Sequence, residues 1–360
     1  MSSHTIRPVI AAFLILAACS RVQQNQETVP NLLLRDYRPI SIHNVPVTGI
    51  SVARYGAIDM HSHAYPRTQQ ALVQWVKTKD AAGIEKTIVL TYAHGQRFDS
   101  LIAVYGQYPE RFELWCGIDY TGYDQPGFGP AAVAELERCY QKGARGIGEL
   151  GDKGKGLFYC KPPAWGMHPD DARMDPIFRK AAELGMPVNL HVADPKWMYE
   201  PMDSTNDGLM NAYKWRLDNQ PDIADHAGMI AILENTLRRH LSTTFIACHV
   251  ANCSYDLDLA GALLDRHPNL YFDFSARFAE LTATPRRTRT FFEKYQDRLL
   301  YGTDMGSAAD MYAFTFRILE SADEHIYSPW NSYHWPLHAL DLPDSILEKV
   351  YRTNALRLIR

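Results

Sequence analysis

Two histidines stand one residue apart at the end of an apolar run, in the stretch AIDMHSHAY at residues 57–65. In a strand, residues i and i+2 point to the same face, so Asp59, His61 and His63 are expected to share one side. Two imidazoles placed this way can bind one metal ion. On this stretch alone, a pair of surface histidines in a loop explains the pattern equally well, so the choice depends on the rest of the chain.

Further ionisable residues end later apolar runs, and four of them are of metal-binding type: Glu149, His191, His249 and Asp304. Imidazole and carboxylate are the ligands that Zn²⁺ accepts besides thiolate. Burying so many polar groups without partners is costly, and a bound divalent ion removes that cost. The sequence therefore predicts a metal centre holding one or two divalent ions, with zinc as the expected metal.

The elements that must position these residues are short β-rich runs alternating with longer helical stretches, a pattern typical of a parallel sheet. Eight such runs are present, at residues 57–63, 86–92, 112–120, 144–150, 187–192, 244–250, 270–276 and 299–305. Eight strands with helical connections predict an α/β fold, a single (β/α)8 TIM barrel over residues 57–360, with its active site at the carboxyl ends of the strands. A doubly wound sheet is the alternative, but it requires a glycine-rich turn after the first strand, where this chain has HSHAYPR.

The N-terminus has the layout of a signal peptide: Arg7, then a ten-residue apolar stretch, then LAAC at residues 16–19. LAAC resembles the lipobox of bacterial lipoproteins. We therefore expect a signal peptide over residues 1–18, a lipid on Cys19, and a tether and pre-barrel segment over residues 19–56. An ordinary secretory signal is the alternative. The lipoprotein interpretation places the protein in the bacterial cell envelope, anchored to a membrane, with the outer membrane or periplasmic face favoured.

Composition restricts the partners. The 360 residues are 46% hydrophobic and 22% charged, with a formal net charge of −4. No basic run stands out, so we do not expect a nucleic-acid partner. A small molecule is the expected partner, and the sequence leaves the oligomeric state open.

In order, the His-x-His pair, Glu149, His191, His249 and the GTD of residues 302–304 resemble the amidohydrolase superfamily. The similarity is strongest to the amidohydrolase-related branch that includes aminocarboxymuconate-semialdehyde decarboxylase. This resemblance implies that His61, His63 and His191 hold a metal. Asp304 would be a further ligand or a base, and His249 would hold a second metal or contact the substrate. Glu149 departs from members that carry a carbamylated lysine at this strand, and is more like members in which a glutamate bridges two metals.

This residue set suits hydrolysis of an amide, lactone or ester, with Asp304 as the general base and His249 as the alternative base. Two alternatives remain open: a metal-dependent decarboxylase of the same superfamily, and a non-catalytic metal-binding surface lipoprotein. Arg67 and Arg277 are candidates to pair with a substrate carboxylate, although either suits a rim ion pair equally well. The long aromatic connection at 193–228, which includes Trp197, is expected to form a substrate-binding lid or to pack on the rim.

Overall fold

The computed structural model describes residues 31–327, 330 and 333–359. Of the described residues, those up to Tyr37 belong to one unit, in which Leu34–Asp36 is a short 3-10 helix, and those from Arg38 onward belong to a second. The expected signal peptide and the lipidated Cys19 lie outside the described residues. Within the described part of the chain, every helix is too short or too polar to cross a membrane.

All eight predicted runs contain strands, and neighbouring strands in each sheet are parallel. They are β1 (Ala57–Ser62), β2 (Ile84–Leu90), β3 (Phe112–Trp115), β4 (Ile147–Asp152), β7 (Val188–Val192), β8 (Phe245–Ala247), β9 (Leu270–Asp273) and β10 (Leu299–Leu300). Sheet β1-β2-β3 meets sheet β4-β7-β8-β9-β10 through a parallel bridge between Cys116 and Ile147. At the other side, Met60 N donates to Tyr301 O at 2.9 Å and Thr303 N donates to His61 O at 3.2 Å. These bonds join the last strand to the first, so the fold is TIM-barrel-like rather than a doubly wound open sheet.

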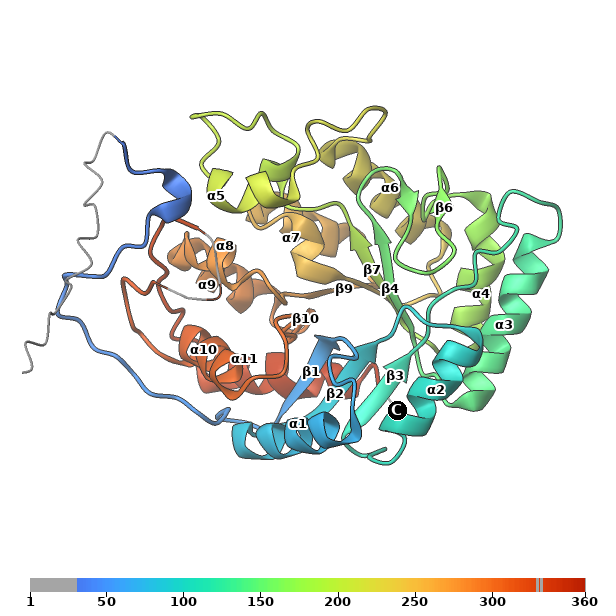
Figure 1. Ribbon diagram of the computed structural model, residues 1–360, viewed down its shortest axis with the longest axis horizontal. Coiled ribbons are helices and arrows are strands. Elements are labelled where there is room, and N and C mark those ends of the chain that lie inside the picture. Colours follow the sequence, from blue (N-terminus) through green and yellow to red (C-terminus); the bar gives the residue numbers. More distant parts are fainter. Residues whose placement is uncertain (1–30, 328–329, 331–332, 360) are drawn as a thin grey trace, which may run out of the picture. The chain divides into compact units, whose positions relative to one another are not determined.

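Helices surround these strands (Figure 1). The longer ones are α1 (Gln69–Ala82), α2 (Gly95–Tyr105), α3 (Phe128–Lys142), α4 (Asp175–Leu184), α6 (His226–Arg239), α7 (Leu257–Arg266), α9 (Pro285–Tyr295) and α10 (Ala309–Glu320). The shorter ones are α5 (Leu209–Ala212), α8 (Phe278–Thr282), α11 (Asp344–Glu348) and α12 (Asn354–Leu356), with η7 (Lys349–Thr353) between the last two. Gly83 ends α1 with a left-handed backbone, which a glycine adopts without steric cost.

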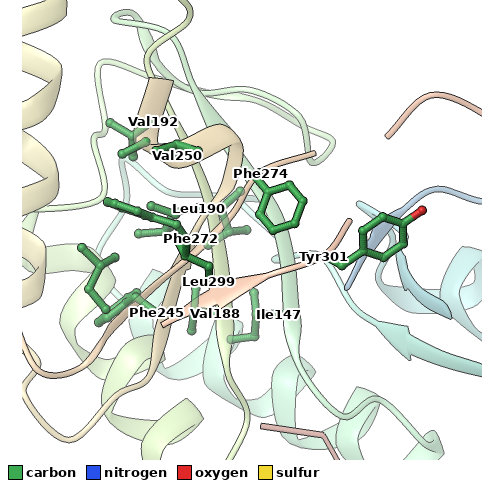
Figure 2. Close-up of a cluster of buried hydrophobic side chains, with 14 of the residues drawn as sticks. Ile147, Val188, Leu190, Val192, Phe245, Val250, Phe272, Phe274, Leu299 and Tyr301 are labelled. Atoms are coloured by element: carbon green, nitrogen blue, oxygen red, sulfur yellow. The ribbon is translucent and has the colours of Figure 1, made fainter. Parts of the chain in front are cut away.

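A hydrophobic core packs against one face of these strands, and it fixes where the polar residues go. Val188, Leu190 and Val192 of β7 contribute alternate side chains to this core (Figure 2). Because successive strand residues point to opposite faces, Asn189 and His191 are directed to the other side of the sheet. The same alternation in β9 separates Phe272 from Asp273. Polar side chains that are two residues apart in a strand therefore lie on the face opposite this core.

Two connections carry additional structure above the carboxyl ends of the strands. The connection after β4 folds back as a hairpin of β5 (Gly156–Leu157) and β6 (Ala164–Trp165). The connection after β7 contains η4 (Lys196–Met198), α5 and η5 (Tyr213–Trp215) and has a small core made of Met198, Ala212 and Leu217. The aromatic connection expected at 193–228 is therefore packed.

Candidate metal centre

The six residues singled out in the sequence meet at the carboxyl ends of the strands. His61 lies in β1 and His63 follows it, while Glu149 and His191 lie in β4 and β7. His249 belongs to η6 (Cys248–Asn252), the turn that directly follows β8, and Asp304 follows β10. The six residues of this cluster fall into two groups of possible metal ligands: Glu149, His191 and His249, which lie with Cys248 and are buried, and His61, which is buried, with His63 and Asp304, which are partly buried. Asp59, expected on the same face, instead accepts hydrogen bonds from Thr303 N (3.0 Å) and Thr303 Oγ1 (2.8 Å), because the register of β1 is irregular between Asp59 and Ser62.

Glu149 lies at the middle of the cluster, and its two oxygens face different histidines. Oε2 is 3.7 Å from His61 Nε2 and 3.6 Å from His63 Nε2. Oε1 is 2.6 Å from His191 Nδ1 and 3.8 Å from His249 Nε2. The carboxylate therefore separates a His61–His63 pair from a His191–His249 pair, and it belongs to both.

Asp304 closes the cluster toward solvent. Its Oδ1 is 3.1 Å from His63 Nε2, and its Oδ2 is 3.9 Å from His61 Nε2 and 3.8 Å from His249 Nε2. The Asp304 side chain is 24% exposed, whereas that of Glu149 is 2% exposed. Of these two carboxylates, Asp304 is therefore the one that a molecule entering from solvent can reach.

The imidazoles are held from behind by groups that the sequence did not single out. Asp273 Oδ2 lies 3.0 Å from His61 Nδ1, the Leu90 carbonyl lies 2.9 Å from His63 Nδ1, and the Ser275 carbonyl lies 2.8 Å from His249 Nδ1. An acceptor at Nδ1 fixes the tautomer and presents the Nε2 lone pair to the cluster. Asp273 was detectable in principle, since it is a charged residue inside the apolar run at 270–276.

The backbone around the cluster is strained where it presents these side chains. His249, Val250, Ala251 and Asn252 have φ between 52° and 60°, and Asp304 has φ of 50°. Left-handed conformations are costly for residues other than glycine, and such strain gathers at functional sites. Gly302 is required here for a different reason: a Cβ at this position would lie 2.8 Å from His61 Cβ.

The electrostatics of the cluster favour positive charge. Burial lowers the pKa of His61, but Asp273, Asp304 and Glu149 outweigh it and raise that pKa well above its usual range. Burial likewise raises the pKa of Glu149, but the charges of His191 and His61 hold it well below its ordinary value. The surrounding carboxylates thus stabilise a cation among them. In contrast, burial and the nearby Arg277 hold the pKa of His249 well below its usual range, which keeps its Nε2 lone pair free.

These observations test whether a divalent ion fits. His61 Nε2 is buried and has no hydrogen-bond partner among the described residues. Two ligand atoms on a tetrahedral Zn²⁺ ion lie roughly 3.4 Å apart, given metal–ligand bonds of about 2.1 Å. The separations of 3.1–3.9 Å among His61, His63, Asp304 and Glu149 Oε2 approach this value. The donor set, the orphaned nitrogen and the charge balance all suit a divalent metal.

A cavity of about 390 Å³ opens from the cluster and is lined by His191, His249 and Asp304 among others. Arg277, a predicted substrate contact, also lines it; the Arg277 side chain donates to Asn252 Oδ1 and lies 3.6 Å from Glu280. The other two predicted contacts are not brought to this cavity. Arg67 is exposed and is not among the lining residues, and Trp197 packs against Tyr333 and Trp335 of the connection between α10 and α11.

Sequence reasoning missed six lining residues that carry charge or a hydroxyl group. They are Lys153 and Asp194, whose side chains form an ion pair at 2.6 Å, Glu280 and Tyr333, whose side chains share a hydrogen bond of 2.8 Å, and also Lys214 and Tyr159. Tyr92 was missed as well: its hydroxyl donates to Glu149 Oε2 at 2.9 Å and lies 2.8 Å from His63 Nε2. Except for Glu280 of the short helix α8, these residues come from connections and strand ends, where no periodic pattern marks the direction of a side chain.

Comparison with known proteins places this cluster in context. The family model described as Amidohydrolase matches residues 58–360. No curated protein matches the chain. Among solved structures, 2,6-dihydroxybenzoate decarboxylase from Rhizobium is 19% identical, with a TM-score of 0.52 over 84% of this chain and 98% of that one.

Two further solved structures are similar to the same extent. Dihydroxybenzoic acid decarboxylase from Polaromonas sp. JS666, which holds manganese and the inhibitor 2-nitroresorcinol, is 17% identical, with a TM-score of 0.53 over 84% of this chain and 96% of that one. A putative amidohydrolase from Staphylococcus aureus is 16% identical, with a TM-score of 0.52 over 84% and 99%. At these identities the likeness shows a shared fold.

Proposed function

The chain belongs to the amidohydrolase family, whose members depend on a metal, and we propose that this enzyme hydrolyses an amide, lactone or ester bond of a small molecule. One observation carries the proposal: the two oxygens of Glu149 face two separate histidine pairs. A carboxylate with this placement suits two ions, of which zinc is the metal we propose. His61, His63 and Asp304 would hold one ion, His191 and His249 would hold the other, and Glu149 would bridge them.

Divalent ions in such a centre polarise a carbonyl group and lower the pKa of water to about 7, so that a hydroxide nucleophile is available at neutral pH. The chain's own residues must then handle the proton. The Asp304 carboxylate suits this task because it is ionised and faces the cavity. Burial raises its pKa, but His61 and His63 outweigh burial and hold the pKa below the ordinary value. Asp304 would accept a proton from water and deliver it to the leaving group.

Decarboxylation is the second candidate, and the comparisons favour it over hydrolysis. The Rhizobium and Polaromonas enzymes that share this fold are decarboxylases. The cavity also holds Lys153, Lys214 and Arg277, which suit a substrate carboxylate. Decarboxylation, however, consumes no water, and it gives no task to a glutamate positioned between two histidine pairs. For that reason we place hydrolysis first.

A product analysis distinguishes the two reactions. Metal-loaded protein is incubated in ¹⁸O-labelled water with a panel of lactones, esters, amides and aromatic carboxylic acids, with CO₂ release monitored. Hydrolysis puts ¹⁸O into the acid product and releases no CO₂. Release of CO₂ without ¹⁸O in the other product would establish decarboxylation and refute the first candidate. Protein that binds metal but turns over no member of the panel would support a non-catalytic metal-binding role.

A further inference from the structure

A second cavity adjoins the metal-centre cavity and has no part in the chemistry described above. We call it the outer pocket, and the metal-centre cavity the inner pocket. The outer pocket has a volume of about 400 Å³, close to that of the inner pocket. The two share four lining residues, namely Lys153, Asp194, Lys214 and Trp215. A substrate held at the metal centre can therefore extend past Trp215 into the outer pocket.

The wall of the outer pocket is largely aromatic. Phe158 and Trp165, from the β5–β6 hairpin, stack with ring centroids 5.6 Å apart and planes inclined by 13°. Trp215, from the connection after β7, contributes another ring, while Leu217 and Ile223 complete the apolar lining. Trp165 and Trp215 are each 52% exposed. Large flat side chains left open to solvent beside a catalytic cavity are suited to cover a planar apolar group.

The charges around this wall are positive and only partly balanced. Lys153 pairs with Asp194 at 2.6 Å, and Arg216 pairs with Asp218 at 2.7 Å. Lys155 and Lys214 also line the pocket, and neither forms an ion pair with a carboxylate of the described residues. Lys214 Nζ lies 5.2 Å from the Trp215 ring centroid. Two uncompensated ammonium groups beside a flat aromatic wall form a site for a ring that carries an anion.

We propose that the outer pocket binds the leaving part of the substrate, and that this part is an aromatic ring bearing a carboxylate. The inference rests on the proposed hydrolysis, since it assigns the bond that is broken to the inner pocket and the released aromatic acid to the outer one. The reaction would then be attack of water on an acyl group, with the proton delivered to the oxygen or nitrogen of the departing aromatic acid.

Paired esters test the idea with metal-loaded full-length protein. The probes are 4-acetoxybenzoate, which carries the carboxylate, and phenyl acetate, which lacks it. We expect a higher kcat/KM for the acid. Lys155→Gln should reduce that preference about fivefold, as expected for a charge pair that solvent can reach. Trp215→Ala should raise KM about threefold to tenfold for both aryl esters, because both rings stack there.

Two controls come from the connection after β7, which also carries Trp215. Lys196→Gln removes an exposed lysine, and Tyr213→Ala removes an exposed aromatic ring, and neither residue lines either pocket. Both variants should keep the parent preference. Equal hydrolysis of the two esters by the parent, or an unchanged preference in Lys155→Gln and an unchanged KM in Trp215→Ala, would overturn the inference while leaving hydrolysis intact.

A binding measurement separates this inference from the proposed function. Benzoate binding is followed by tryptophan fluorescence in metal-loaded and in chelator-treated protein, because the outer pocket contains none of the six metal-binding residues. If neither ester is hydrolysed but benzoate binds, and Lys155→Gln weakens it about fivefold, the aromatic-acid site stands and hydrolysis falls. Absence of benzoate binding in the parent would overturn the site itself.

Discussion

Replacing Glu149 by Gln tests the bridging arrangement directly. Glutamine keeps the shape and one oxygen but loses the charge that both histidine pairs face. We expect two ions per chain in the parent and one in Glu149→Gln. At a free metal concentration of about 100 times Kd, each bound ion stabilises the folded state by about 2.7 kcal/mol. Loss of one ion should thus cost about 2.7 kcal/mol, which lowers the Tm of the metal-loaded protein by roughly 4 °C.

Glu149→Gln also lowers the stability of the metal-free protein, and this effect can be measured separately from the loss of an ion. Glu149 accepts hydrogen bonds from Tyr92 at 2.9 Å and from His191 at 2.6 Å, and Gln can accept only through its single oxygen. The loss of one charge-assisted bond costs about 1.5–3 kcal/mol in chelator-treated protein. Subtracting the chelated melting temperature from the metal-loaded one therefore isolates the ion's contribution.

The control for this experiment is Glu320→Gln. Glu320 is also buried and accepts from a tyrosine hydroxyl, that of Tyr351, at 2.9 Å, but it takes no part in the cluster. It should lose some stability and keep both ions. Elemental analysis gives the ion count for each protein. Two ions in Glu149→Gln, or a single ion in both the parent and the variant, would refute the bridging role. Decarboxylation would then be favoured over hydrolysis.

Three other outcomes are expected. Asp304→Asn should keep most of its metal by elemental analysis but lose about 10²- to 10⁴-fold in turnover, and near-full turnover would point to His249 as the base. The hydrogen bond to Asp152 raises the pKa of His168 in the folded protein. This bond therefore stabilises the folded state fully at a pH below the pKa of His168 in the unfolded chain, and the stabilisation is lost as the pH rises through the pKa of His168 in the folded protein. His168→Gln should therefore lower the free energy of unfolding, measured by urea titration, by about 1 kcal/mol at acidic pH and by less at alkaline pH. An equal loss at both pH values would contradict this. Cys19→Ala should abolish palmitate labelling in a bacterial host and release the protein from the membrane fraction, while continued labelling would exclude Cys19 as the lipidation site.

The strands and the family were predictable from the sequence because both depend on regular features. Each of the eight apolar runs contains a strand, and the predicted membership of the amidohydrolase family is confirmed by a match over residues 58–360. Placement of His191 followed from alternation alone, since Val188, Leu190 and Val192 face the core. Placement of Asp59 was wrong because an irregular register interrupts the alternation in β1.

Residues in connections were less predictable, because no period fixes the direction of their side chains. Trp197 was expected at the substrate and instead packs against Trp335 without lining either pocket, whereas Trp215, eighteen positions later in the same connection as Trp197, lines both pockets. The two side chains are of one type, and only the fold of the connection separates them. Lys153 and Lys155 follow the same rule: they lie in the connection between β4 and β5, where Lys153 lines both pockets and Lys155 lines the outer one.

The orientation of the metal-binding histidines shows a deeper limit of sequence reasoning. A histidine can bind an ion through Nε2 only if its ring is turned and its proton lies on Nδ1, and an acceptor behind Nδ1 imposes both conditions. For His61 that acceptor is the side chain of Asp273, which a sequence can reveal. For His63 and His249 it is a backbone carbonyl, of Leu90 and Ser275 respectively. Every residue has a carbonyl group, so no residue type marks these two acceptors. The ligands of such a centre can therefore be predicted from a sequence, whereas the backbone acceptors that orient their rings are identified only once the strands are packed side by side.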